Sequence, residues 1–368
     1  MTRFLSLALL AAATLVTGCE AVDMGQAEAR GDTEEIIVLT DSATWAGPVG
    51  DAIRAELGRP IVTLPSNQGA FKLRHQPLTS RFFENLKLQP NLVFAAPIDT
   101  EGDIGDFLRA RVGEENLAQV RSGTVSAVNL REDLWANNQL VTIATAASDS
   151  ALAAQIRRRG PELRQAYETL ARERTIGEMF SRLQQTDLEE ELLAARGYRV
   201  NIQYDYVKVQ DTTATVAGRT GSFVRYRRVL SDTWRDFFVF AQDGVATLPP
   251  PAEIDRITDG LLETFARGSL DSSYVQLDDQ RPMRRGTAEI AGRPAREQRG
   301  FWYMTNDLMA GSYVRYAFVD EETDRLYVYY GMTFAPSRTL DKREFLRQME
   351  AIVYTFRTAA DVRREADP

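Results

Sequence analysis

The hexapeptide GSFVRY at residues 221–226 recurs as GSYVRY at residues 311–316, and this pair decides the fold of the second half of the chain. A second strand signal follows each copy, at 237–240 and 326–329, and each unit ends in a helix with an apolar stripe. The copies start 90 residues apart, far beyond the period of about 20–50 residues in solenoid repeats. They therefore predict a duplicated strand–strand–helix unit, with antiparallel sheet and with helices packed on one face.

The duplicated unit predicts a C-terminal α+β domain over residues 197–357. Further strands are expected near 198–209 and 287–303, where aromatic and β-branched residues gather. The last residues, 358–368, are predicted to form a disordered tail. The fold class is therefore α+β, with antiparallel sheets and packed helices.

Upstream of this region, strand and helix signals alternate and predict an N-terminal α/β domain over residues 35–196. A long amphipathic region at 150–174 is expected to break at Gly160-Pro161, because proline cannot continue helical hydrogen bonding. Another helix is expected over 175–195. The other predicted elements are strands near 36–39, 71–74, 92–94, 124–130 and 139–145, and helices near 49–57, 79–86 and 104–112.

The chain begins with a leader in which Arg3 precedes an apolar stretch, 4–16, that is too short to cross a bilayer as a permanent helix. The run LVTGC at 15–19 resembles the lipobox of bacterial lipoproteins. The resemblance implies a signal peptide over 1–18 that is removed, followed by lipidation of Cys19, the only cysteine of the chain. Several acyl chains, palmitate among them, would then anchor the protein stably, whereas a single chain binds marginally.

Glu20 follows this cysteine in place of the aspartate that retains a lipoprotein at the inner membrane in the best-known Gram-negative sorting rule. We therefore expect a lipid-anchored protein of the outer membrane that faces the periplasm. Residues 19–34 are polar and lack periodicity, so they predict a flexible tether between the membrane and the folded body.

The formal net charge of the chain is −8. An acidic body does not predict nucleic-acid binding, which requires a clustered basic surface that neutralises phosphates. With Cys19 assigned to lipid, the mature chain has no cysteine left for a disulfide or a thiol nucleophile, and zinc sites built from cysteine and histidine are excluded. We expect no cofactor and no bound metal.

Catalytic motifs in the sequence are weak, and we expect no catalytic residue. His75 is the only histidine, and no serine lies in the Gly-x-Ser-x-Gly arrangement of a Ser-His-Asp hydrolase. Residues 99–103 imitate the opening of a calcium loop, but Ala110 stands where the bidentate glutamate belongs. A pair of carboxylates for glycoside hydrolysis stays open as an alternative, because their separation is spatial.

Trp302, Asn306, Arg225 and Arg315 form the candidate interaction surface. The aromatic ring of Trp302 either lines a glycan or peptide groove or packs within the sheet. Arg225 and Arg315 recur in the two copies, and strand alternation places them on one face. They either pair within the fold, which is the favoured interpretation, or contact a ligand.

Three segments of the chain resemble domain of unknown function 4837: residues 35–58, 133–145 and 300–352, the last of which contains WYMTNDLMAGSYVRYAFVDEETDRLYVYYG. The resemblance extends over nearly the whole chain after the leader. It implies a lipoprotein of Gram-negative bacteria. It implies no catalytic residues, because the family has no assigned activity.

The sequence thus predicts a lipid-anchored cell-envelope protein that binds or scaffolds an envelope component without catalysis. The expected partners are the membrane, through the N-terminal lipid, and an envelope protein or glycan. The alternative is a carboxylate-dependent hydrolase that acts on envelope polysaccharide. No pattern in the sequence indicates an oligomeric state.

Overall fold

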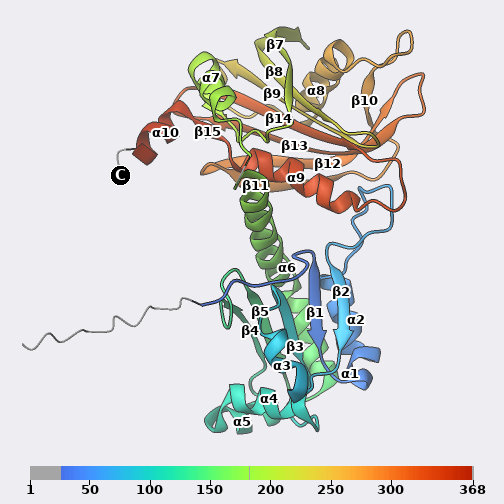
Figure 1. The fold of residues 1–368 in the computed structure, drawn as a ribbon, viewed down its shortest axis with the longest axis vertical. Helices are drawn as coiled ribbons and strands as arrows, with labels where there is room; N and C mark the ends of the chain where they lie inside the picture. Colours follow the sequence, from blue (N-terminus) through green and yellow to red (C-terminus); the bar gives the residue numbers. More distant parts are fainter. Residues whose placement is uncertain (1–25, 182, 367–368) are drawn as a thin grey trace, which may run out of the picture.

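A computed structural model describes residues 26–181 and 183–366, which form two domains joined by one long helix (Figure 1). The predicted signal peptide and Cys19 lie outside the described residues. Helix and strand make up 35% and 34% of the structure, so the predicted α+β class is confirmed. In the part of the chain that the structure describes, no helix is both long and apolar enough to cross a bilayer.

The N-terminal domain is a parallel sheet with one antiparallel edge strand and helices on both faces. Every residue of β3 and β5 is buried, as expected for strands covered on both sides. The sheet order is β2 (Lys72–Gln76), β1 (Glu35–Leu39), β3 (Asn91–Ala95), β5 (Leu140–Thr145) and β4 (Ala127–Glu132), with β4 antiparallel to β5. One face packs on α1 (Ser42–Ala46), α2 (Pro48–Glu56) and α6 (Asp149–Phe180), the other on α3 (Phe83–Leu86), α4 (Asp103–Val112) and α5 (Glu114–Arg121), with a 3-10 turn η1 (Ser80–Phe82) before α3.

Helix α6 is continuous over its 32 residues, so the predicted break at Gly160-Pro161 is wrong. Leu152 and Ile156 before the proline and Leu163 and Tyr167 after it pack into the same core. This packing offsets the lost helical hydrogen bond. At about 1.5 Å per residue the helix is about 48 Å long, and its last turn enters the core of the C-terminal domain through Met179 and Phe180.

Helix α7 (Thr186–Arg196) belongs to the C-terminal domain, which corrects the predicted boundary at residue 196. Its residues Leu188 and Leu192 pack against Tyr198 and Val200. The domain boundary therefore lies at residues 181–185. The predicted helix over 175–195 is wrong for the same reason, because its first residues complete α6.

The C-terminal domain is an antiparallel sheet in which the two predicted copies lie side by side. Copy one supplies β7 (Val207–Val216), β8 (Arg219–Val229) and β9 (Trp234–Asp243), and copy two supplies β12 (Arg293–Met304), β13 (Ala310–Asp320) and β14 (Arg325–Phe334). The sheet order is β10-β12-β13-β14-β9-β8-β7, with β10 (Val275–Asp278) at one edge and β11 (Arg284–Ile290) paired to β12. The copies therefore meet at β9 and β14 in reversed order, which confirms the duplicated unit.

Strand pairing refines the alignment of the two copies. Arg225 lies opposite Phe238, and Arg315 lies opposite Tyr330. Phe238 and Tyr330 are therefore equivalent, at an offset of 92 residues (from 238 to 330). Strands are present near 198–209 and 287–303, as predicted, and each range is interrupted. The first range contains β6 (Tyr198–Arg199) and the start of β7, and the second spans parts of β11 and β12 around a turn at Ala291-Gly292.

The two repeat helices cover opposite faces of the sheet, so the expectation of helices on one face is wrong. Helix α8 (Pro251–Phe265) packs on the face that carries Phe223 and Tyr313. Helix α9 (Lys342–Tyr354) packs on the face that carries Val224 and Val314. Side chains of β9 and β14 are buried on both faces, so each face requires a covering layer.

The connections after β9 and β14 explain the different directions of the helices. Gly244 follows β9 with a φ of 74°, a left-handed conformation that glycine adopts without steric cost. Pro336 occupies the equivalent position in the second copy, at the offset set by strand pairing. Proline cannot adopt a positive φ, so the backbone leaves the sheet in a different direction after each copy.

Both predicted flexible ends of the described chain are ordered. Glu28 pairs with Asn137 in a short bridge, and Glu34 is buried. Residues 26–34 thus pack on the folded body and are not a tether. At the other end, β15 (Arg357–Thr358) pairs with β6, and α10 (Ala359–Ala366) replaces the predicted disordered tail.

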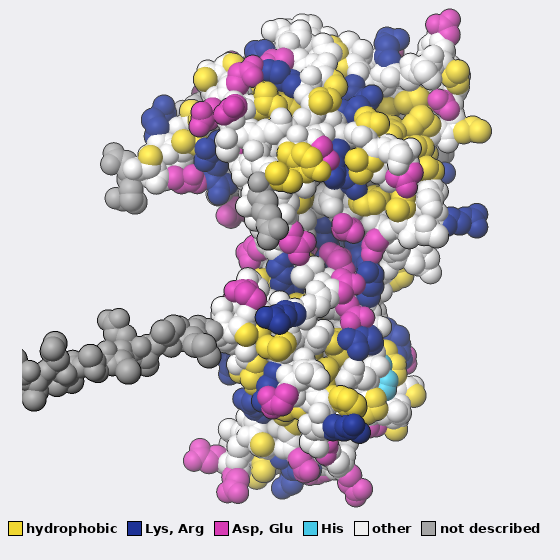
Figure 2. Space-filling view, viewed as in Figure 1, with side chains coloured by type: hydrophobic (Ala, Val, Ile, Leu, Met, Phe, Trp, Pro, Cys, Tyr) yellow, Lys and Arg dark blue, Asp and Glu magenta, His cyan; other side chains and the backbone are white. Residues whose placement is uncertain are grey.

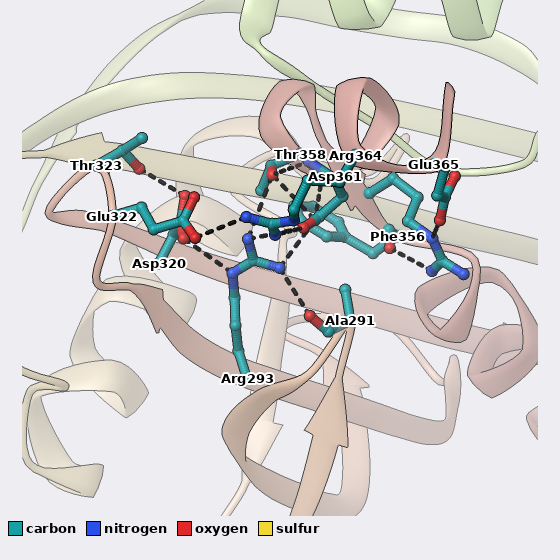
Figure 3. Close-up of polar contacts among 11 residues, drawn as sticks. Ala291, Arg293, Asp320, Glu322, Thr323, Phe356, Thr358, Asp361, Arg364 and Glu365 are labelled. Carbon is teal, nitrogen blue, oxygen red and sulfur yellow. Dashed lines mark hydrogen bonds and ion pairs between the residues drawn. The ribbon is translucent and has the colours of Figure 1, made fainter. Parts of the chain in front are cut away.

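A buried ion-pair cluster holds α10 on the sheet (Figure 3). Arg293 pairs with Asp361 at 2.8 Å and with Asp320 at 3.0 Å. Thr358 and Asp361 form a capping box, in which the Thr358 N–H donates to the Asp361 carboxylate at 2.8 Å and the Asp361 N–H donates to Thr358 Oγ1 at 3.2 Å. Burial alone would raise the pKa of Asp361, but hydrogen bonds from Arg293 and Thr358 lower it to about 2.

A loop between α2 and β2 reaches from the N-terminal domain onto the C-terminal domain. Leu64 enters the core beneath α9. Ser312 Oγ donates to the Thr63 carbonyl at 2.6 Å, and Gln68 Oε1 accepts from the backbone N–H groups of Lys342 and Arg343 at 3.1 and 3.2 Å. Gln68 therefore caps α9 from the other domain, in the role that a local residue usually fills.

Candidate anion-binding site between the domains

The predicted interaction surface does not form in the structure. Trp302 is fully buried, and its indole N–H donates to the Thr333 carbonyl at 3.2 Å. Arg225 and Arg315 are also buried. Asn306 is exposed in the turn between β12 and β13, with a φ of 58°. Three of the four residues are buried because β12, β8 and β13 are covered on both faces.

The two recurring arginines pair inside the fold with different partners. Arg225 forms a two-point ion pair with Asp236, with both N–O distances at 2.7 Å. Arg315 pairs with Asp255 of α8 and donates to Thr258 Oγ1 at 3.0 Å. Two-point guanidinium–carboxylate pairs hold both groups in a defined orientation. Arg225 and Arg315 therefore stabilise the domain.

Residues weighed for catalysis or metal binding are engaged elsewhere. His75 Nε2 lies 3.2 Å from the Thr40 carbonyl, and its ring stacks on Trp45 at 5.1 Å. Asp99 pairs with Arg121 at 2.8 Å, and Asp103 accepts from the Ser80 N–H at 2.7 Å. Across residues 26–181 and 183–366, no three His, Cys, Asp or Glu side chains gather as a metal site would require.

A cavity of about 460 Å³ lies between the two domains. The loop after α2 and the second half of α6 form one side, and β11, β12 and α9 form the other. Figure 2 shows acidic and basic side chains gathered at this waist of the molecule. The volume falls within the range of about 300–1,000 Å³ that is typical of small-molecule sites.

Arginine dominates the walls of this cavity. Among the described residues that line it are eight arginines and four glutamates, a formal excess of four positive charges. The arginines are Arg59, Arg164, Arg172, Arg284, Arg285, Arg299, Arg343 and Arg347, and the glutamates are Glu168, Glu289, Glu297 and Glu350. Four of these arginines, Arg164, Arg285, Arg343 and Arg347, pair with carboxylates outside the lining. The positive charge that can attract an anion therefore lies on the arginines that have no carboxylate partner.

One part of the wall is a fixed ion-pair network on β12 and α9. Arg299 pairs with Glu297 and Glu350, and Tyr316 OH donates to Glu350 Oε1 at 3.1 Å. Burial would raise the pKa of Glu350, but the neighbouring Arg299 guanidinium outweighs burial and lowers it. Glu350 is therefore an ionised carboxylate, held in place by its partners.

A second ion-pair network joins the domains across the cavity wall. Arg343 pairs with Glu34 at 2.8 Å, and Arg347 pairs with the same carboxylate. The Arg343 and Arg347 guanidiniums also donate to the carbonyls of Gly69 and Ala70, each at 2.8 Å. Burial raises the pKa of Glu34, and the two arginines oppose that effect. These contacts fix α9 against the N-terminal domain.

Arg59, Arg172 and Arg284, which we call the rim arginines, differ from the rest of the wall. Within the described chain they form no ion pair with a carboxylate. Arg59 and Arg284 are exposed, and Arg172 is half-buried. The Arg172 guanidinium lies 3.7 Å from the centre of the Tyr354 ring, a cation–π contact that holds it at the cavity.

Glu168 lies on α6 between two arginines of the cavity lining, one turn from Arg164 and one turn from Arg172. Burial raises the pKa of its carboxyl group, and the negative charge of Glu350 adds to the effect. The Arg299, Arg347 and Arg164 guanidiniums act in the opposite direction but do not cancel it. A half-buried carboxyl group of this kind donates a hydrogen bond when it is protonated.

Sequence reasoning missed this site, although a signal exists. Residues 164, 168 and 172 recur at the four-residue spacing of a helix face, as do 343, 347 and 350 at spacings of four and three. Each charged stripe lies beside an apolar one on the same helix, which is also the pattern of a helix that is partly open to water. That both stripes face one cavity follows from the docking of the domains.

Comparison with known families divides the chain in the same place as the structure. Residues 185–355 match the model of domain of unknown function DUF4837, and residues 29–180 match that of domain of unknown function DUF8532. The resemblance to DUF4837 is confirmed for the C-terminal domain but does not extend to 35–58 and 133–145, which lie in the other match. No curated protein matches the chain.

Proposed function

We propose that this protein is a lipid-anchored envelope protein that binds an anionic component in the cavity between its domains and catalyses no reaction. The arginine-rich lining of that cavity is the observation that carries the proposal. Guanidinium groups bind carboxylates and phosphates through parallel hydrogen bonds. The cavity of about 460 Å³ is large enough to hold a small anionic ligand against these guanidinium groups.

The leader and Cys19 support anchorage at the outer membrane, on its periplasmic side. Gln26 Nε2 donates to the Asp133 carbonyl at 2.7 Å, so the folded body begins close to residue 26. Seven residue steps separate this position from Cys19, and such a chain reaches at most about 25 Å. The N-terminal domain would thus stay near the membrane surface.

A hydrolase that uses carboxylates is the second candidate, because Glu168 and Glu350 line one cavity with pKa values shifted in opposite directions. Such a split is how a general acid and an ionised partner arise in glycosidases. Non-catalytic binding is favoured because Arg299 and Tyr316 already occupy the Glu350 carboxylate.

Photo-crosslinking in intact envelopes tests the binding proposal. A photoreactive residue replaces Ala288, a half-buried residue of the cavity lining, and the matched control replaces Val125, which is 40% exposed on the N-terminal domain. We expect crosslinked envelope material at position 288 and not at 125. Equal labelling at both positions, or none at 288, would contradict the proposal.

Two further measurements test anchorage and catalysis. A Cys19→Ala variant is expected to leave the membrane fraction on alkaline washing, and its retention there would contradict lipid anchorage. Wild-type protein incubated with envelope polysaccharide is expected to release no new reducing ends. Release that Glu168→Gln abolishes would favour the hydrolase.

A further inference from the structure

We infer that the ligand of the inter-domain cavity carries at least two oxyanion groups, phosphates or carboxylates, which the rim arginines bind from both domains at once. This inference rests on the proposed function and deepens it. Arg59 and Arg172 belong to the N-terminal domain and its long helix, and Arg284 belongs to β11 of the C-terminal domain.

The other lining arginines have their donors engaged by the protein. Arg164 pairs with Glu56 at 3.1 Å, Arg285 pairs with Asp255 at 2.9 Å, and Arg299 lies between two glutamates. Within the described chain, the Arg59 and Arg284 side chains form no hydrogen bond, and the Arg172 guanidinium donates only a long one, to Thr169 Oγ1 at 3.4 Å. Most N–H donors of the rim arginines thus stay available to a ligand. Planar guanidinium forks match the paired oxygens of phosphate and carboxylate groups.

The size of the cavity argues for more than one anionic group. Its 460 Å³ is about fifteen times the ~30 Å³ that one water occupies in the liquid. A lone phosphate would leave most of that space to solvent. A ligand with two charged ends contacts both walls.

Glu168 makes anion binding depend on pH. The charged groups that face it are Arg164 and Arg172 on its own helix, Arg347 and Glu350 on α9, and Arg299 on β12. When Glu168 is protonated it can donate a hydrogen bond to an oxyanion, and when ionised it adds a second negative charge beside Glu350. For an anion whose own charge stays constant, affinity is therefore highest at low pH and falls as pH rises through the pKa of Glu168.

Calorimetric titration of the full-length, detergent-purified protein tests these points. Pyrophosphate represents a phosphate ligand, digalacturonate a carboxylated sugar, and inorganic sulfate is the probe for pH because its charge is constant between pH 5 and pH 8. We expect pyrophosphate or digalacturonate to bind once per chain and more tightly than sulfate. Which of the two binds better distinguishes a phosphate source from a carboxylate source.

Variants locate the site. Arg172→Gln and Arg284→Gln should each weaken binding at least about tenfold, the loss expected for one charge-assisted hydrogen bond. Arg157→Gln, on an exposed turn of the same helix α6, is the matched control and should change nothing. Arg284 lies on an exposed part of β11, so its variant remains informative if Arg172→Gln fails to fold.

The pH arm uses Glu168→Gln, which keeps the hydrogen-bond donor and removes the charge. Wild-type affinity for sulfate should fall from pH 5 to pH 8, and the variant should bind equally at both. Binding of every probe without any effect of Arg172→Gln and Arg284→Gln would overturn the inference. So would the absence of binding by all three probes, even where crosslinking at position 288 succeeds and the proposed function stands.

Discussion

The two copies in the C-terminal domain share their strands but differ in what their helices do. Helix α8 buries one apolar stripe and leaves residues such as Arg256 and Glu263 in water. Helix α9 is buried almost all round, with Ile352 and Val353 toward the sheet and Arg347 and Glu350 toward the cavity. The second copy thus contributes to the site, because its helix lies on the face of the sheet that meets the other domain.

The largest expected difference between the copies concerns their recurring arginines. Arg225→Met leaves Asp236, which is 1% exposed, with one remaining partner, Arg227. We expect urea unfolding to show a loss of about 3 kcal/mol, near the lower end for a broken buried ion pair. Arg225→Met combined with Asp236→Leu should recover part of it, and no recovery would contradict the role assigned to the pair.

The equivalent change in the second copy should cost less. In Arg315→Met, Asp255 keeps its contact with Arg285 at 2.9 Å and remains partly open to water. The loss expected from unfolding curves is about 2 kcal/mol, the range for leaving buried hydrogen-bond partners unsatisfied. A loss larger than that of Arg225→Met would contradict the comparison.

Substitution of Gly244, which precedes the helix of the first copy, should lower the free energy of unfolding by less. Gly244→Ala puts a side chain at a φ of 74° and should lower stability by about 1 kcal/mol. Gly177→Ala, at an exposed site inside α6 with no heavy atom near the added carbon, is the control and should stabilise by about 0.5–1 kcal/mol. Equal effects of the two changes would contradict the role of Gly244.

The smallest effect is confined to α10, which follows the second copy. Asp361 has a pKa near 2, below its ordinary value of 3.8, so its contribution to stability is present above that ordinary value and is lost as pH falls toward 2. The amide hydrogens of α10 should be protected from exchange at pH 4, relative to an unfolded peptide, and should lose that protection at pH 2. Asp361→Asn should lack the protection at both pH values, and protection of the variant at pH 4 would contradict this role of Asp361.

Local patterns predicted the elements and the duplication, but not where neighbouring layers would lie. The strands around Phe223 and Tyr313 follow from alternation, which needs no tertiary information. The face of the sheet that α9 covers depends on the connection after the last strand of each copy, where Gly244 of the first copy corresponds to Pro336 of the second. Thr358 and Asp361 have the spacing of a capping box, a local pattern that indicates α10 where a disordered tail was predicted.

The candidate site was beyond prediction because its parts are distant in the chain. Arg59, Arg172 and Arg284 come from three separate elements, and nothing local distinguishes them from the many other arginines of the sequence. The raised pKa of Glu168 arises from burial and from Glu350, both of which depend on the docking of the domains. Trp302, which the sequence predicted in an interaction surface, lies in the core instead.

The loop that caps α9 forms its contacts late in folding. Gln68 can accept its hydrogen bond only when the backbone N–H of Arg343, 275 residues further along the chain, is in place. Leu64 likewise packs into a core that α9 completes. Contacts this distant in sequence close late, because the intervening chain must first be ordered. The N-terminal domain is synthesised first, yet its surface at the loop is completed among the last steps of folding, when the end of the chain has arrived.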